Sequence, residues 1–191
     1  CIYTRKIRHN CEKSNLKFLV TVKKNLVLLG MMGVGKSTIG KIVAKKQNLK
    51  FIDTDFNIEK KRSMTIAEIF KIKGEKFFRL LEEKEVLEAL KKSKCVIALG
   101  GGAFIKKNVR DKILKDSISV WLDINLKTLN KRVKWSNKRP LLNNDENNRI
   151  KINKLYSERK NIYKLANYRI NCNNLSKHDI ANKIIGLYEA H

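Results

Sequence analysis

The chain has 191 residues and carries 43 Lys and Arg against 18 Asp and Glu, a formal net charge of +25. This length suits one domain with a sizeable core and is short for two. No apolar run approaches the ~20 residues that span a bilayer, and no signal-peptide segment is present, so we expect a cytoplasmic protein without membrane contact.

Residues 1–24 are expected to form a basic N-terminal arm outside the domain. They hold seven Lys or Arg and one acidic residue, Glu12, with weak periodicity. Three interpretations stay open: a disordered tail, an extra strand around residues 18–20, or an organellar presequence that conforms poorly to the usual pattern. Removing the arm takes away six net positive charges and leaves +19, so the basic character belongs to the domain.

From residue 25 onward, short apolar runs alternate with helical stretches. The predicted strands are residues 26–29, 51–52, 95–99, 118–122 and 168–171. The predicted helices are residues 36–47, 75–92, 126–134, 153–165 and a last helix from residue 177. A further helix is opened by the capping box of residues 65–68 and is interrupted at Gly74, before the helix of residues 75–92. This alternation is typical of parallel strands with crossover helices, so we expect an α/β fold, a three-layer α/β/α sandwich with a five-stranded parallel sheet.

A glycine-rich segment follows the first predicted strand. Residues 30–37 read G-M-M-G-V-G-K-S, a complete G-x-x-x-x-G-K-[ST] pattern between a strand and a helix, a context that disfavours a chance match. Backbone N–H groups of such a loop surround a phosphate chain, Lys36 can reach the terminal phosphates and the Ser37 hydroxyl can ligate Mg²⁺. The segment predicts a sandwich of the P-loop kinase type, with nucleotide-binding residues Gly33, Val34, Gly35, Lys36, Ser37 and Thr38.

Two acidic residues, Asp53 and Asp55, follow the second predicted strand at the edge of the sheet where ligands bind. Their i, i+2 spacing in an extended chain directs both carboxylates to one side. One could hold Mg²⁺ with Ser37 while the other accepts a hydroxyl proton, as phosphoryl transfer to an alcohol requires. A helix N-cap or a solvated turn is the alternative, because both acids suit turns.

Three consecutive glycines, residues 100–102, end the third predicted strand. They cost backbone entropy without adding packing, which suits a place where a ligand approaches the main chain; a plain tight turn is the alternative. Arg79 lies among apolar residues of a predicted helix, where a guanidinium requires an anion. That anion is either a ligand or Glu82 or Glu83 in an ion pair without function.

A polar, Asn-rich run follows Arg139, and a long loop of this kind in a compact domain is either disordered or a lid. We expect a lid near residues 134–150, with Arg139 reaching the phosphates when the site closes.

The lysines are scattered over separate segments without an aromatic-interleaved stripe, which favours solvated lysine faces over a nucleic-acid site. The four cysteines follow no metal-ligand spacing, and we expect neither disulfides nor zinc.

Six segments together resemble the shikimate kinase family, over nearly everything from residue 25 to the end. They are G-M-M-G-V-G-K-S-T, F-I-D-T-D, I-A-E-I-F-x-x-x-G-E-x-x-F-R-x-x-E, L-G-G-G-A, R-x-x-x-x-x-x-R-P-L-L and E-R-x-x-x-Y. The first segment alone would admit any small-molecule kinase, whereas all six in this order point to one family. The resemblance implies a fold like that of the nucleoside monophosphate kinases and transfer of the γ-phosphoryl group of ATP to the 3-hydroxyl of shikimate, giving shikimate 3-phosphate and ADP.

The resemblance also implies roles for individual residues. Lys36 would stabilise the transferring phosphoryl group, Ser37 would ligate one Mg²⁺ that Asp53 supports through water, and Asp55 would bind and activate the acceptor hydroxyl. The other implied roles are a carboxylate clamp of Arg79 and Arg159, contacts of Gly101 and Gly102 with the ring hydroxyls, a pocket shaped by Phe70, Phe78 and Glu82, a lid arginine at Arg139, and packing of Arg132 on adenine.

Three other functions stay open at the level of the sequence. A kinase of another small polyhydroxylated acid, such as gluconate, would use the P-loop and the acid pair equally well. A non-catalytic ATP-binding relative and a basic nucleic-acid binder belong to other classes, but Lys36, Asp53, Asp55 and Arg139 give no sign of lost catalysis. We expect a monomer that binds ATP and shikimate.

Overall fold

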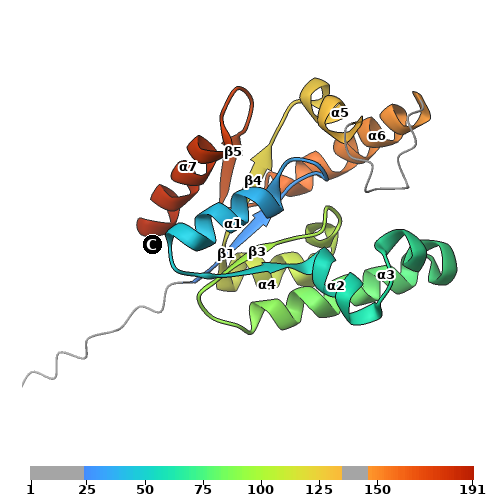
Figure 1. Cartoon of the computed structure of the whole chain (residues 1–191), viewed down its shortest axis with the longest axis horizontal. Coiled ribbons are helices and arrows are strands. Elements are labelled where there is room, and N and C mark those ends of the chain that lie inside the picture. Colours follow the sequence, from blue (N-terminus) through green and yellow to red (C-terminus); the bar gives the residue numbers. More distant parts are fainter. Residues whose placement is uncertain (1–23, 135–145) are drawn as a thin grey trace, which may run out of the picture.

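A computed structural model describes residues 24–134 and 146–191 (Figure 1). Its strands are β1 (Asn25–Leu29), β2 (Lys50–Asp53), β3 (Cys95–Ala98), β4 (Ser117–Asp123) and β5 (Tyr168–Asn171). Its helices are α1 (Lys36–Lys46), α2 (Thr54–Arg62), α3 (Ile66–Leu90), the short 3₁₀ turn η1 (Ala103–Ile105), α4 (Lys107–Asp116), α5 (Leu126–Lys134), α6 (Glu146–Tyr163) and α7 (Lys177–Glu189). Arg139, nearly all of the expected arm and most of the expected lid lie outside the described residues.

The five strands form one sheet in the order β2-β3-β1-β4-β5, and every neighbouring pair is parallel. In the centre, Leu28 pairs with Ala98 of β3 and with Val120 of β4. All five residues of β1 are buried, as expected for a parallel strand covered on both faces. The expected five-stranded parallel sheet of an α/β fold is therefore confirmed.

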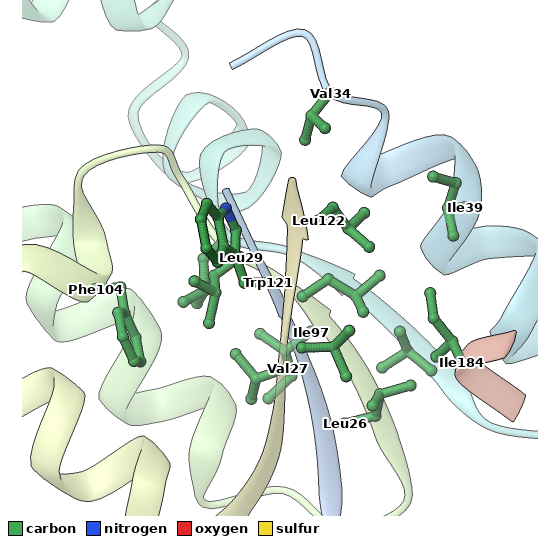
Figure 2. Packing of buried hydrophobic residues seen from close by; sticks show 14 of the residues in the cluster. Leu26, Val27, Leu29, Val34, Ile39, Ile97, Phe104, Trp121, Leu122 and Ile184 are labelled. Atoms are coloured by element: carbon green, nitrogen blue, oxygen red, sulfur yellow. The ribbon is translucent and has the colours of Figure 1, made fainter. Parts of the chain in front are cut away.

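Helices cover both faces of this sheet (Figure 1). Helices α1 and α7 pack together on one face, whereas α4 lies against β4 on the other. Successive residues of a strand point to opposite faces, so Leu26 and Val27 enter different halves of the core. Figure 2 shows Leu26 on the side of Ile184 from α7, and Val27 on the side of Phe104 from η1. Among the described helices, none combines the length and apolar character of a membrane span.

A second, smaller cluster of apolar side chains holds α2 against the first part of α3. Its buried members are Ile58, Ile69 and Phe78, and they are separate from the main core. The predicted capping box opens α3: Thr65 Oγ1 accepts a hydrogen bond from Glu68 N at 3.2 Å. The predicted interruption at Gly74 is also present, as a kink with φ 80° and ψ 168°.

Within the described residues, the structure adds two α-helices and the short turn η1 to the predicted elements and lengthens a third α-helix. Helices α2 and α4 were not predicted, because each buries only two residues among many charged ones: Thr54 and Ile58 in α2, Val109 and Ile113 in α4. The prediction that α6 begins at residue 153 was wrong, since α6 begins at Glu146. Its first turns contain Asn and charged residues that hide the helical period, so the helix also overlaps the end of the expected lid.

Candidate active site

The segments that follow β1, β2 and β3 meet at the carboxyl edge of the sheet, where parallel α/β sheets bind their ligands. They supply residues 30–35, the start of α2 with Asp53 and Asp55, and the glycine triplet of residues 100–102. Helices α3 and α6 add side chains to the same edge, through contacts with that triplet. Within the described residues, these three segments and the two helices therefore gather in one place.

The loop after β1 has the geometry of a phosphate-binding loop. Gly33 and Gly35 have φ of 77° and 101°, a region that glycine adopts at low cost, and Gly35 is the N-cap of α1. The helix therefore directs its N-terminal N–H groups toward the loop, and these favour an anion. Lys36 is buried, and its ammonium donates to the carbonyls of Gly30 at 2.9 Å and Met31 at 3.0 Å.

Ser37 and Thr38 lie exposed at the start of α1, while Val34 is buried below the loop. Ser37 Oγ lies 2.5 Å from Asp53 Oδ2. Arg132 of α5 is exposed and donates from Nη1 to the carbonyl of Val34 at 3.4 Å. The predicted serine at the end of the loop thus contacts the predicted acid Asp53, and the predicted arginine Arg132 contacts the loop itself.

Asp53 serves two partners. As the N-cap of α2, it accepts from the Phe56 N–H through Oδ1 at 3.2 Å, while its Oδ2 accepts from Ser37. The helix-cap alternative for this residue is therefore correct, and it leaves one oxygen at the loop. The extended-chain argument for the acid pair was wrong, because β2 ends at Asp53 and Asp55 lies in the first turn of α2.

Asp55 nevertheless reaches the site, against Gly100. A Cβ built on Gly100 would lie 2.4 Å from Asp55 Oδ1 and 2.5 Å from Glu82 Oε1, so the two carboxylate oxygens are within about 4.9 Å of each other. Any side chain at position 100 would collide with these two carboxylates. Glycine at this position therefore lets Asp55 and Glu82 pack against the main chain, and the approach of a ligand to the triplet stays a prediction.

Thr54, which the sequence interpretation did not select, joins this turn to the sheet. Its fully buried hydroxyl donates to the carbonyl of Ala98 at 3.2 Å and accepts from the N–H of Gly100 at 3.1 Å. One side chain thus holds the start of α2 against the end of β3, with Asp55 next in the chain. The sequence could have indicated Thr54 through its position between Asp53 and Asp55.

Arg79 of α3 is held by acids on its own helix. It donates from Nη1 to Glu82 at 2.7 Å, and from Nε and Nη2 to one oxygen of Glu75 at 3.2 and 3.0 Å. Burial acts to lower the pKa of this guanidinium, but the two acids outweigh it and raise the pKa, so the group stays charged. Glu83, the other candidate partner, instead accepts from Lys106 and Asn108.

Two aromatic rings lie beneath this guanidinium. Phe70 and Phe78 pack against each other with ring centroids 4.7 Å apart, and Arg79 lies 5.9 Å and 5.3 Å from the two ring centroids. A Cβ on Gly102 would lie 2.2 Å from Arg79 Nη1. The arginine, the aromatic pair and the end of the glycine triplet therefore form one wall of the site.

Arg159 of α6 reaches the middle glycine. Its Nη1 donates to the carbonyl of Gly101 at 3.1 Å. The same carbonyl accepts from the hydroxyl of Tyr163, which the sequence interpretation included in a motif but gave no role. Two guanidinium groups, those of Arg79 and Arg159, and two carboxylates, those of Asp55 and Glu82, thus adjoin three successive glycines.

Comparison with known proteins identifies relatives over most of the chain. The family model described as shikimate kinase matches residues 32–189. A shikimate kinase from Sulfurihydrogenibium sp. (strain YO3AOP1) is 43% identical over 162 residues, which cover 85% of this chain and 96% of the relative.

Solved structures give the same family. Shikimate kinase from Acinetobacter baumannii in complex with shikimate matches with a TM-score of 0.82 and 33% identity, covering 87% of this chain and 93% of that one. A gluconokinase from Sinorhizobium meliloti 1021 matches with a TM-score of 0.56 and 15% identity, covering 88% and 93%, a likeness that shows the fold alone.

Proposed function

This chain belongs to the shikimate kinase family and transfers the γ-phosphoryl group of ATP to the 3-hydroxyl of shikimate; we propose that the residues at the carboxyl edge of the sheet divide this reaction as follows. One arrangement carries the proposal. The guanidinium groups of Arg79 and Arg159 adjoin Gly102 and Gly101, next to the glycine that adjoins Asp55. Glu82 also adjoins Gly100, but it is paired with Arg79. Two cations beside the Asp55 carboxylate fit a small acceptor that carries both a carboxylate and a reacting hydroxyl.

The phosphate end of the site is the loop of residues 30–37. Its backbone N–H groups and the N-terminus of α1 hold the phosphate chain of ATP. The ammonium of Lys36, held at the loop by two carbonyls, offsets the negative charge that spreads over the γ-phosphoryl oxygens during transfer. Gly33, Val34, Gly35, Ser37 and Thr38 complete the nucleotide contacts.

At the acceptor end, Asp55 orients the 3-hydroxyl and accepts its proton as the oxygen attacks the γ-phosphoryl group. Arg79 and Arg159 bind the carboxylate of shikimate, since planar guanidinium groups match carboxylates in charge and shape. Glu82 holds Arg79 in place with a 2.7 Å ion pair.

Gly101 and Gly102 let the main chain approach the ring hydroxyls, because neither adds a side chain to the pocket. The rings of Phe70 and Phe78 supply an apolar wall below Arg79. This wall excludes water from the acceptor, which favours transfer to the hydroxyl over hydrolysis of ATP.

The oxygen atoms of Ser37 and Asp53 are suited to Mg²⁺. They lie 2.5 Å apart beside the phosphate-binding loop, and hard oxygen ligands of this kind are those that Mg²⁺ prefers. Mg²⁺ is usually held by one or two protein oxygens together with substrate phosphates and water, so these two residues suffice. The ion, when bound with ATP, offsets phosphate charge.

Two further arginines complete the proposal. Arg132 contacts the loop and would pack on adenine. Arg139 lies outside the described residues, so its role on the phosphates stays a prediction from the R-x-x-x-x-x-x-R-P-L-L motif.

The monomeric state and the cytoplasmic location also stay predictions. Size-exclusion chromatography would test the first, and cell fractionation would test the second.

The experiment that tests this function is a substrate panel. Purified protein would be supplied with ATP, Mg²⁺ and either shikimate, gluconate or another polyhydroxylated acid, and ADP release would be followed by a coupled assay. Of these acceptors, we expect only shikimate to cause ADP release. The Lys36→Met variant should release no ADP with shikimate. Faster turnover with gluconate would favour the other kinase, and ATP binding without transfer to any acceptor would favour a non-catalytic relative.

A further inference from the structure

The carbonyl of Gly101 accepts hydrogen bonds from two side chains of the same helix. Arg159 Nη1 donates at 3.1 Å, and the hydroxyl of Tyr163, one turn later in α6, donates as well. That hydroxyl also lies 3.9 Å from Met31 Sδ in the phosphate-binding loop. Tyr163 is 1% exposed, so a single buried hydroxyl joins α6, the glycine triplet and the loop after β1.

The two donors differ in what else they must do. A carbonyl has two lone pairs and can accept from both, but Arg159 is also needed by the acceptor carboxylate. If Arg159 were the carbonyl's only partner, turning its Nη1 to the acceptor would leave this half-buried carbonyl without a partner in the protein, which is unfavourable. A second donor that stays in place removes this competition.

We propose that Tyr163 is a positioning residue for the acceptor clamp: its hydroxyl holds the Gly101 carbonyl, so that Arg159 is available to the carboxylate of shikimate. The inference rests on the proposed function, in which Arg159 binds that carboxylate. Tyr163 itself does not touch the acceptor. It acts through Arg159, by keeping the Gly101 carbonyl paired.

The chemistry of Tyr163 suits a permanent donor. Burial, only partly offset by the nearby Arg159, raises the pKa of its hydroxyl to about 12, so it remains protonated at the pH of kinase assays. Its ring packs against Trp121 with centroids 6.0 Å apart. Tyr163→Phe keeps the ring and this packing and removes only the hydroxyl.

Helix α6 also offers a matched control. Tyr156 lies one turn before Arg159, and its hydroxyl donates to Asp123 Oδ1 at 3.1 Å rather than to the Gly101 carbonyl. Burial and the Asp123 charge raise the pKa of Tyr156 to about 12 as well. Tyr156→Phe therefore removes the same group from the same helix without touching Gly101.

The experiment measures KM for shikimate, KM for ATP, kcat and melting temperature in the full chain and its variants. We expect Tyr163→Phe to raise KM for shikimate about five- to tenfold, with KM for ATP within about twofold. Tyr156→Phe should lower the melting temperature by a similar amount but leave KM for shikimate within about twofold. Equal KM for shikimate in the two tyrosine variants would overturn the proposal.

A double variant separates this inference from the function on which it rests. Because Tyr163 acts through Arg159, its effect on KM should disappear in an Arg159→Ala background, a non-additivity expected of coupled residues. Additive effects of the two substitutions would refute the positioning role alone. If Arg159→Ala by itself left KM for shikimate unchanged, the carboxylate clamp of the proposed function would be wrong, and the role of Tyr163 with it.

Discussion

Replacing Gly102 with Ala should displace Arg79 while sparing the fold. Gly102 has φ −104° and ψ −17°, a conformation that alanine adopts without strain. The added Cβ would lie 2.2 Å from Arg79 Nη1 and 2.8 Å from Cζ. The end of a flexible side chain can move where backbone cannot, so the guanidinium, rather than the main chain, gives way.

The size of the effect follows from these distances. Nη1 must retreat by about 1.2 Å, the difference between 2.2 Å and the 3.4 Å of an ordinary contact. Such a shift separates the arginine from Glu82, which it now contacts at 2.7 Å, and from the acceptor carboxylate. A lost hydrogen bond to a charged group is worth about 1.5–3 kcal/mol, or roughly a ten- to hundredfold rise in KM for shikimate.

The assay follows ADP release by a coupled reaction. Shikimate is varied at saturating ATP in one series, and ATP is varied at saturating shikimate in the other. KM for ATP should stay within about twofold, because the phosphate-binding loop is unchanged. Gly186→Ala in α7 is the control for glycine replacement, since its Cβ would meet nothing within 4 Å. Gly101→Ala, whose Cβ would lie 3.4 Å from Arg159, should have a smaller effect. A folded Gly102→Ala enzyme with unchanged KM for shikimate would refute the clamp at Arg79.

Three further predictions concern the reaction and the arm. Asp55→Asn should lower kcat more than ~10²-fold, because proton acceptance is lost. ATP binding, measured by equilibrium dialysis, should persist because the phosphate-binding loop is intact. Near-normal turnover would exclude Asp55 as the base. Lys36→Met should abolish transfer, since an uncharged side chain cannot offset phosphoryl charge, and an active variant in the coupled assay would place catalysis elsewhere. Deleting residues 1–22 should leave kcat/KM within about threefold, because the arm contains none of the site residues, whereas misfolding of the truncated chain would mean that the arm packs on the domain.

Much of the nucleotide half of the site could be predicted from sequence because its residues are contiguous. Glycines, Lys36 and Ser37 lie within one strand-loop-helix segment, and their geometry depends mainly on local backbone conformation. The strand runs were equally local, which is why the α/β class and the five parallel strands could be predicted. Helices α2 and α4 were missed because their few buried positions are separated by charged residues.

The acid pair shows where local reasoning fails. Spacing correctly selected Asp53 and Asp55, but the direction of their side chains depends on where β2 ends and α2 begins. That boundary lies between the two acids and is held by Thr54, whose hydroxyl bonds to β3 and to Gly100. A contact between residues 46 positions apart is invisible to any periodicity in the sequence.

The sequence by itself therefore determined the class of fold, the phosphate-binding loop and, through six ordered motifs, the family. Tertiary structure alone decided the strand order, the pairing of Glu83 with Lys106 and Asn108, and the meeting of Arg159 with Gly101 across 58 positions. The physical reason is the range of the interactions. Backbone conformation and capping follow from neighbouring residues, whereas the partners of a side chain depend on which segments the folded core brings together.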